Sequence, residues 1–149
     1  MSNTYSSMFY HCVWGTKKRH PFLISPVDVM VHDLIKTVIE QHGGRVLAIG
    51  GMPDHVHVLL SKKPTVAMSL LMQYAKGSTS RLIRETYVNM GSFSWQRGTG
   101  IFSIRYSDIG IVSAYIKKQA RHHDLQSFES EYRFLLSENG FEQNEIDLE

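Results

Sequence analysis

Residues 45–61 read RVLAIGGMPDHVHVLLS, and their pattern predicts a β-hairpin. Arg45–Gly51 and His55–Ser61 are rich in aliphatic and β-branched residues, as strands are, and Met52-Pro53-Asp54 between them is typical of a tight turn. We therefore expect these two strands to pair as neighbours in an antiparallel sheet.

Before the hairpin, the sequence predicts one strand and one helix. Met8–Trp14 alternates and is rich in aromatic and β-branched residues, as a strand would be, and a basic loop over Gly15–Pro21 follows it. Ser25 before Pro26 is typical of a helix N-cap with proline at the first helical position. Apolar residues then recur at helical spacing until Gly43-Gly44, which predicts that the helix ends there.

After the hairpin, the pattern predicts three helices and one more strand. Gly77, in the middle of the first of these helices, costs about 1 kcal/mol relative to alanine, which indicates a kink or a close approach to another backbone. The predicted elements are a helix over Val66–Tyr87, a glycine-rich loop over Gly91–Gly100, a short strand over Ile101–Arg105, and helices over Ser107–His123 and Ser127–Asn139.

The order of these elements is βαββαβ followed by further helices. This order predicts an α+β fold of the ferredoxin-like, or RRM-like, kind, which is an antiparallel sheet with helices on one face and extra C-terminal helices. A length of 149 residues corresponds to one domain, so we expect residues 1–149 to form a single domain.

Composition excludes several classes of protein. Cys12 is the only cysteine, which rules out an intrachain disulfide and zinc sites built from several cysteines. No apolar run approaches the ~20 residues that span a bilayer, and the first residues lack the pattern of a signal peptide, so we expect a cytoplasmic protein without membrane contact. Because the Walker loop, the Rossmann fingerprint and the nucleophile-elbow motif are absent, we expect no nucleotide cofactor.

Charge is unevenly distributed along the chain, although the net charge is only +2. Residues 1–61 carry a net charge of +1, residues 62–121 a net charge of +8, and residues 122–149 a net charge of −7. A basic middle attracts polyanions, because each neutralised phosphate releases condensed counterions. A solvated surface whose acidic tail folds back over the basic part explains the same pattern, so charge alone leaves both interpretations open.

His55 and His57 are the first candidate site residues. They are two positions apart on a predicted strand, so both imidazoles point to the same face, as two ligands of one divalent ion must. Val56, Val58 and Leu60 occupy the opposite face, which suits a hydrophobic core. A pair of this kind also arises by chance, so a structural role for the histidines stays open.

Tyr115 and Gln119 are the second candidate pair. At positions i and i+4 of a helix they lie on one face, at the edge of the apolar stripe formed by Ile109, Val112 and Ile116. A tyrosine at such an edge is also typical of a boundary core residue whose hydroxyl reaches water.

Taken together, these stretches resemble the single-tyrosine HUH transposases, the small transposases of single-strand insertion sequences, and their relatives, the REP-associated tyrosine transposases. Met52–Leu60 resembles the His-hydrophobic-His signature of that family, and Tyr115–Gln119, followed by His122-His123, resembles its nucleophile helix. Thr99 departs from the family, in which an aromatic residue is expected between these glycines. Further stretches that agree in order are His11–Arg19, Lys76–Arg81, Phe93–Ser103 and the tail with Ser127-Phe128, Glu131 and Leu135-Leu136.

The resemblance implies a site and a reaction. His55 and His57 would be metal ligands with Gln119 as the third, and Tyr115 would be the nucleophile. The metal would be Mg²⁺ or Mn²⁺, acting as a Lewis acid on the scissile phosphate. Attack would leave a 5′-phosphotyrosine link and a free 3′-OH, and the covalent bond would store the energy for rejoining.

The resemblance also implies partners. The substrate would be single-stranded DNA that carries a hairpin, and the protein would be a homodimer in which the tyrosine of one subunit can complete the metal site of the other. The side chains expected to contact the DNA are Lys17, Lys18, Arg19, Lys76, Arg81 and Arg97.

Two other functions stay open at this point. The first is a catalytically inactive or domesticated module that binds hairpins, and the second is a metal-dependent hydrolase of small phosphoesters. We expect the hydrolase least, because the sequence shows no general-base carboxylate beside the histidines. Four candidates also remain for the group that removes the proton of Tyr115: the metal, Lys117, Lys118 and water.

Overall fold

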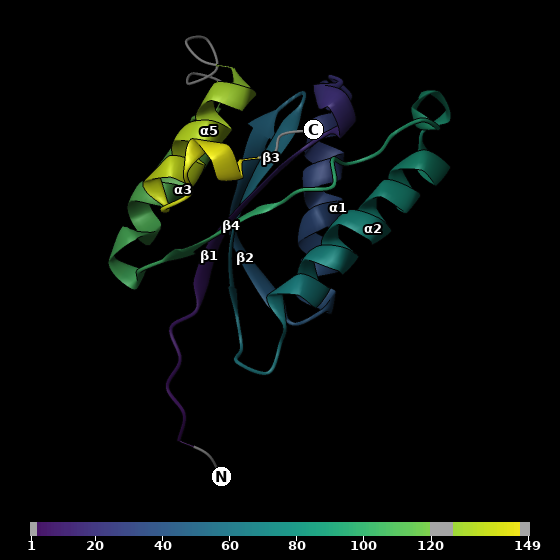
Figure 1. Ribbon diagram of the computed structural model, residues 1–149. Helices are drawn as coiled ribbons and strands as arrows, with labels where there is room; N and C mark the ends of the chain where they lie inside the picture. Colours follow the sequence, from purple (N-terminus) through teal and green to yellow (C-terminus); the bar gives the residue numbers. More distant parts are fainter. Residues whose placement is uncertain (1–2, 120–126, 147–149) are drawn as a thin grey trace.

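Four strands form one antiparallel sheet in the computed structural model of the chain, which describes residues 3–119 and 127–146 (Figure 1). The strands are β1 (Phe9–Gly15), β2 (Gly44–Met52), β3 (His55–Lys62) and β4 (Gly100–Ile104). Their order in the sheet is β2-β3-β1-β4, and each neighbouring pair is antiparallel. The predicted hairpin is the β2–β3 pair at one edge, and the α+β fold of the predicted class is confirmed.

One face of the sheet is covered by α1 (Val27–Gln41) and α2 (Met68–Thr86), which pack against each other and lie together in Figure 1. The apolar side of β3 points to this face, as the alternation predicted. The main hydrophobic core lies here and includes Cys12, Trp14, Ile35, Ile39, Val56, Val58, Leu60, Leu71, Ala75 and Ile83.

The opposite face of the sheet is covered by α3 (Ile109–Lys117) and α5 (Phe128–Glu138). Ile116 of α3 packs on Leu59, and Phe128 of α5 belongs to a cluster with Val13. The extra C-terminal helices that the sequence predicted therefore make the second helical layer, and the histidine side of β3 lies beneath it.

Short 3-10 turns connect these elements. The turns are η1 (Lys17–Arg19), η2 (Val88–Met90), η3 (Tyr106–Asp108) and η4 (Gln143–Glu145).

In the described part of the chain, no helix is both long enough and apolar enough to pass through a membrane.

Two local predictions are wrong. Ser25 is not the N-cap of α1, because Pro26 holds the capping position and no side chain there accepts a hydrogen bond. Gly77 marks neither a kink nor a close backbone approach, because α2 runs unbroken through it. A Cβ atom at Gly77 would stand in open space, with no atom of another described segment within 4 Å. The glycine is therefore tolerated on an exposed helical surface.

The predicted C-terminal helices are found in part. α3 begins at Ile109, after a 3-10 turn over Tyr106–Asp108, and ends at Lys117 with Lys118 as its C-cap, so it is shorter than the helix predicted over Ser107–His123. His122 and His123 lie outside the described residues. α5 begins after Ser127, whose Oγ accepts a hydrogen bond from the backbone N–H of Ser130 at 3.2 Å. This cap agrees with the helix predicted over Ser127–Asn139.

Candidate active site

The imidazoles of His55 and His57 lie side by side beneath α3 and α5, and both are 0% exposed. Glycines on the neighbouring strands let the helices come close to them. Gly50 is paired with His57 across β2–β3, and a Cβ atom there would stand 2.5 Å from the carbonyl oxygen of Ile116 in α3. Gly15 is paired with His55 across β1–β3, and its missing Cβ leaves room for the ring of Phe128.

Each histidine has its Nδ1 atom held by a polar neighbour. Oδ1 of Asp54 lies 2.7 Å from Nδ1 of His55, and Nε2 of His11 lies 2.8 Å from Nδ1 of His57. A carboxylate only accepts, so Nδ1 of His55 carries the proton and donates it to Asp54. In neutral His55 the lone pair is then on Nε2, which faces the interior of the site.

A carboxylate from α5 completes this cluster. Oε1 of Glu131 lies 2.7 Å from Nε2 of His57 and 3.6 Å from Nε2 of His55, and Glu131 is 1% exposed. The sequence did not single out Glu131 as a site residue, and the expectation that no carboxylate lies beside the histidines is wrong. One feature of the sequence could have identified Glu131. It lies three residues after Phe128 and directly before Tyr132, so it is an acid on the apolar face of a predicted helix.

Gln119 also reaches the cluster. Its Oε1 atom lies 3.2 Å from Nε2 of His55, and its side chain is buried with 1% exposure. Gln119 lies just beyond the end of α3 at Lys117, and it and Tyr115 of α3 both come close to the histidines.

These residues fit a divalent cation. The ligand atoms of His55, His57 and Glu131 all lie within 4.8 Å of one another. With the proton of His55 on Nδ1, its Nε2 lone pair and Oε1 of Gln119 are two acceptors facing each other, an arrangement that a bound cation would satisfy. A set of imidazole nitrogens with a carboxylate or amide oxygen suits Mn²⁺ and other divalent ions of similar softness.

Tyr115 of α3 lies at the rim of the cluster. Its ring centroid is 5.7 Å from that of His57 and 6.2 Å from that of His11. Burial raises the pKa of the Tyr115 phenol above its ordinary value, and the charge of Glu131 and a hydrogen bond to it raise the pKa further, against an opposing contribution from Gln119. The phenol is therefore protonated at neutral pH in this arrangement.

Glu131 is ionised beside this phenol. Burial would raise the pKa of Glu131, but the hydrogen bond and charge of His57, with weaker contributions from Tyr115 and His55, lower it to about 2. Burial, together with the charge of His57, lowers the pKa of His11 to about 3, so His11 is neutral near pH 7.

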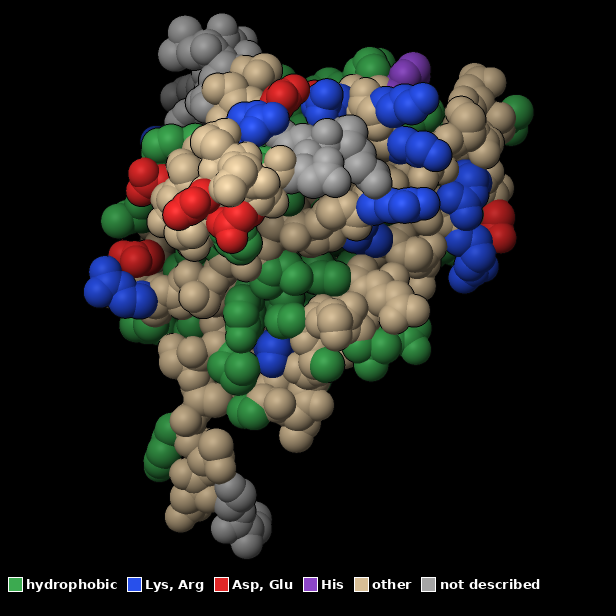
Figure 2. All heavy atoms as spheres, in the orientation of Figure 1, with side chains coloured by type: hydrophobic (Ala, Val, Ile, Leu, Met, Phe, Trp, Pro, Cys, Tyr) green, Lys and Arg blue, Asp and Glu red, His purple; other side chains and the backbone are tan. Residues whose placement is uncertain are grey.

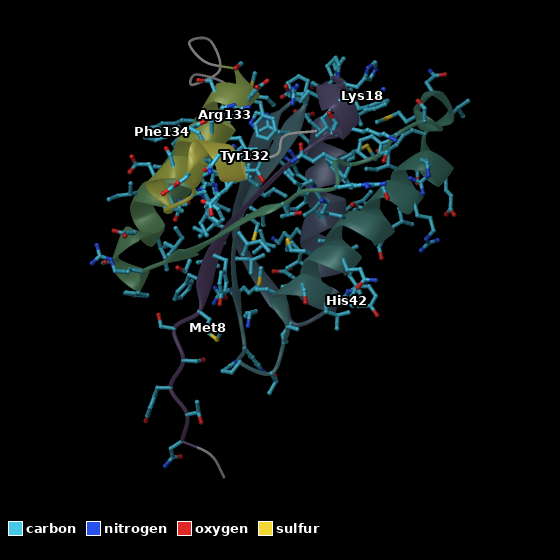
Figure 3. All side chains as sticks on the ribbon, in the orientation of Figure 1. Met8, Lys18, His42, Tyr132, Arg133 and Phe134 are labelled. Carbon is cyan, nitrogen blue, oxygen red and sulfur yellow. The ribbon has the colours of Figure 1, made fainter. Side chains whose placement is uncertain are left out.

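α5 covers the cluster with more than one side chain. Phe128 stacks on His55 at a centroid distance of 4.2 Å, and its other neighbour Tyr132 is 5.4 Å away. Figure 3 shows Tyr132 on the side of α5 that faces the sheet and Phe134 on the other side.

Glu129 forms a 3.6 Å ion pair with Arg19 of the basic loop, so an acidic segment does fold back over part of the basic region.

Three of the predicted DNA contacts lie together. Lys17, Lys18 and Arg97 line one surface cavity of about 350 Å³ with Ser94 and Trp95. Figure 2 shows Lys and Arg side chains gathered at the upper right of the molecule.

The other predicted DNA contacts are engaged within the chain. Arg19 pairs with Glu129, and Arg81 pairs with Glu85 at 3.5 Å on the exposed side of α2. Nζ of Lys76 donates to the carbonyl oxygens of Arg97 and Gly98 and to Oγ1 of Thr99, at 3.1, 3.0 and 2.9 Å. Thr99, which departs from the resemblance, thus accepts a hydrogen bond from a predicted DNA-binding lysine.

The sequence model of the family described as "Transposase IS200 like" matches residues 4–119. The chain belongs to this family. The matched residues include His55, His57, Tyr115 and Gln119. The match ends before α5, so Glu131 lies outside it.

Individual IS200-like transposases resemble the chain over most of its length. The ISDra2 transposase TnpA of Deinococcus radiodurans is 29% identical over 122 residues, which cover 78% of this chain and 85% of that protein. The transposase for the insertion sequence element IS200 of Salmonella typhimurium is 26% identical over 115 residues, covering 74% and 75%.

Solved structures share the fold of this IS200-like transposase. A crystal structure of a proposed transposase from Deinococcus radiodurans has a TM-score of 0.62 at 24% identity and covers 80% of this chain and 96% of that one. A REP-associated tyrosine transposase bound to a REP hairpin has a TM-score of 0.61 at 16% identity, with 83% and 74% coverage. The resemblance stated from the sequence motifs is therefore confirmed.

Proposed function

We propose that this IS200-like transposase cuts and rejoins single-stranded DNA, with Tyr115 as the nucleophile and a 5′-phosphotyrosine link as the intermediate. The observation that carries the proposal is the position of Tyr115, whose ring lies 5.7 Å from that of His57 at the edge of a buried His-His-Glu group. Attack of the phenolic oxygen on phosphorus forms one phosphoester bond as another breaks, and the 3′ oxygen leaves with a proton.

A divalent ion, Mg²⁺ or Mn²⁺, would be held by His55, His57 and an oxygen of Glu131 or Gln119, and when bound it would supply Lewis-acid stabilisation of charge on the scissile phosphate. The residues around it position the donors. Asp54 holds the ring of His55 through Nδ1, and Phe128 stacks on that ring and shields it from water.

Glu131 orients the Tyr115 hydroxyl rather than removing its proton. A carboxyl with a pKa of about 2 is a much weaker base than a phenolate whose pKa is raised above its ordinary value. The hydrogen bond between them therefore fixes the direction of the hydroxyl and leaves its proton in place.

For the substrate, we propose single-stranded DNA with a hairpin. The solved relative bound to a REP hairpin and the cavity lined by Lys17, Lys18 and Arg97 support this choice. The phosphate backbone of an unpaired strand is bound by cationic side chains, and these three residues supply them. We further propose that residues 1–149 act as one transposase domain, as a homodimer and in the cytoplasm.

The test is a covalent adduct. The full chain is incubated with labelled single-stranded DNA from the flanks of its own gene and with Mn²⁺, and adducts are separated on a denaturing gel. The wild-type protein should form an adduct that Tyr115→Phe lacks, while hairpin binding by that variant persists. Tyr106→Phe is the matched control, because Tyr106 is an exposed tyrosine just before α3.

A second candidate function, hydrolysis of small phosphoesters, gains support from Glu131, since a carboxylate does lie beside the histidines. It predicts turnover without any adduct. Turnover of a small phosphoester together with no adduct in the wild-type protein would therefore favour the hydrolase and reject the transposase mechanism. Adducts that persist in Tyr115→Phe would move the nucleophile to another residue.

A further inference from the structure

We propose that His11 is a positioning residue of the candidate metal centre, holding the ring of His57 so that Nε2 of His57 faces the cation. This inference rests on the proposed function, because it assumes that His57 is a ligand. His11 lies on β1, outside the hairpin that carries the histidine pair, and its Nε2 atom is 2.8 Å from Nδ1 of His57.

The sheet register brings the two rings together. Val13 is the direct partner of His57 across β1–β3, and His11 is the partner of Leu59. His11 and His57 are therefore diagonal neighbours on one face, a distance that ring side chains bridge. Their ring centroids are 5.0 Å apart with an interplanar angle of 26°, and His11 is 4% exposed.

Two neighbouring rings pack against His11. Phe102 and Tyr115 each meet it edge-on, with ring centroids 6.2 Å away. These contacts bury the ring, whereas its hydrogen bond goes to His57. His11 thereby also touches the residue proposed as the nucleophile.

The chemistry of a histidine ligand explains why a polar group belongs at position 11. A histidine that binds a cation through Nε2 carries its proton on Nδ1 and needs an acceptor there. For His57 that acceptor is His11, and for His55 it is Asp54, whose Oδ1 is 2.7 Å from Nδ1. The two ligands thus have matching support, from a buried imidazole in one case and a carboxylate in the other.

An apolar side chain at position 11 would remove this support without opening the core. His11→Leu would leave the Nδ1–H of His57 without an acceptor and free its ring to turn. His11→Gln keeps a carbonyl oxygen that can accept from Nδ1 and is the conservative replacement. Phe102→Leu is the matched control, because Phe102 packs on His11 from the same face and makes no hydrogen bond to the cluster.

The experiment measures Mn²⁺ binding to the full chain in the absence of DNA, by following the free-ion signal in electron paramagnetic resonance. We expect His11→Leu to weaken Mn²⁺ affinity by about 10–100-fold, the range for loss of a partner behind a metal ligand. We expect His11→Gln to stay within a few-fold of the wild-type protein, and Phe102→Leu to bind as the wild type does, even if it melts at a lower temperature. Circular dichroism records the folding of each variant.

Two results would overturn the inference. One is wild-type affinity in folded His11→Leu, and the other is equal weakening in Phe102→Leu, which would make the effect one of packing. If His11→Leu does not fold, a weakened His11→Gln would reject the role as well, since it keeps the acceptor. Failure of the wild-type protein to bind Mn²⁺ would reject the metal centre itself, whereas normal wild-type binding without a DNA adduct would reject the nucleophile alone.

Discussion

Oε1 of Glu131 lies 2.7 Å from Nε2 of His57, so a carboxylate from α5 meets a histidine from the middle of the sheet in a fully buried contact. The two residues are 74 positions apart in the chain. The family match ends at Gln119, so the acid lies outside the matched residues. Its charge acts on both the candidate ligands and the candidate nucleophile.

Removing the charge of Glu131 should lower the pKa of Tyr115. Glu131→Gln keeps the shape of the side chain, and burial continues to hold the pKa of the phenol above its ordinary value, because burial is the largest cause of the shift. The ¹³C shift of the labelled Tyr115 ring, followed against pH and assigned with Tyr115→Phe, measures the change. Glu129→Gln, on the same helix but paired with Arg19, should leave the pKa of Tyr115 as it is. An unchanged titration in Glu131→Gln would contradict the assigned cause.

Acid should destabilise the protein partly through Glu131. The pKa of Glu131 is about 2 in the folded chain against an ordinary value of 4.5, so the unfolded chain takes up this proton first. The resulting contribution to the free energy of unfolding is present above about pH 5 and is lost as the pH falls towards about 2. Urea unfolding across this range should show a steeper loss in the wild-type protein than in Glu131→Gln. Parallel curves for the two proteins would show that Glu131 has no such role.

Two glycines should respond in opposite ways to the same change. Gly50→Ala would press a methyl group against the Ile116 carbonyl, so we expect it to lower the free energy of unfolding by about 1–3 kcal/mol. Gly77→Ala places the methyl group in open space on a helix and should raise the free energy by about 0.5–1 kcal/mol. Chemical denaturation measures both variants. A neutral Gly50→Ala would mean that α3 can move away from β2 without cost.

The cavity lined by Lys17, Lys18 and Arg97 should carry part of the salt dependence of DNA binding. Lys17→Gln and Lys18→Gln should each lower the slope of log affinity against log salt by about 0.7, the value for one phosphate contact on a single strand. Lys36→Gln, an exposed lysine on α1, makes the same change in net charge and should leave the slope as it is. Equal slopes in all three variants would show that only net charge matters.

Local periodicity predicted most of the architecture. Alternation in His55–Ser61 correctly separated the histidine face from the core face. Gln119 lies beyond the end of α3 and still reaches the cluster that Tyr115 borders. Glu131 was missed because nothing in local spacing says that α5 lies over the histidines. The partner of Lys76 was missed for the same reason, since its three acceptors come from a loop more than twenty residues away. Short-range signals indicate which face a residue takes, and tertiary contacts decide what it meets there.

The ammonium group of Lys76 fastens the turn at Arg97–Thr99 to the middle of α2 through three oxygens. One consequence is mechanical. A strand of nucleic acid that pulled on the guanidinium of Arg97 would pull on α2, a helix of 19 residues, and not on a loop free to move by itself. Force applied at this loop would act on α2 and on the α1–α2 layer that covers this face of the sheet.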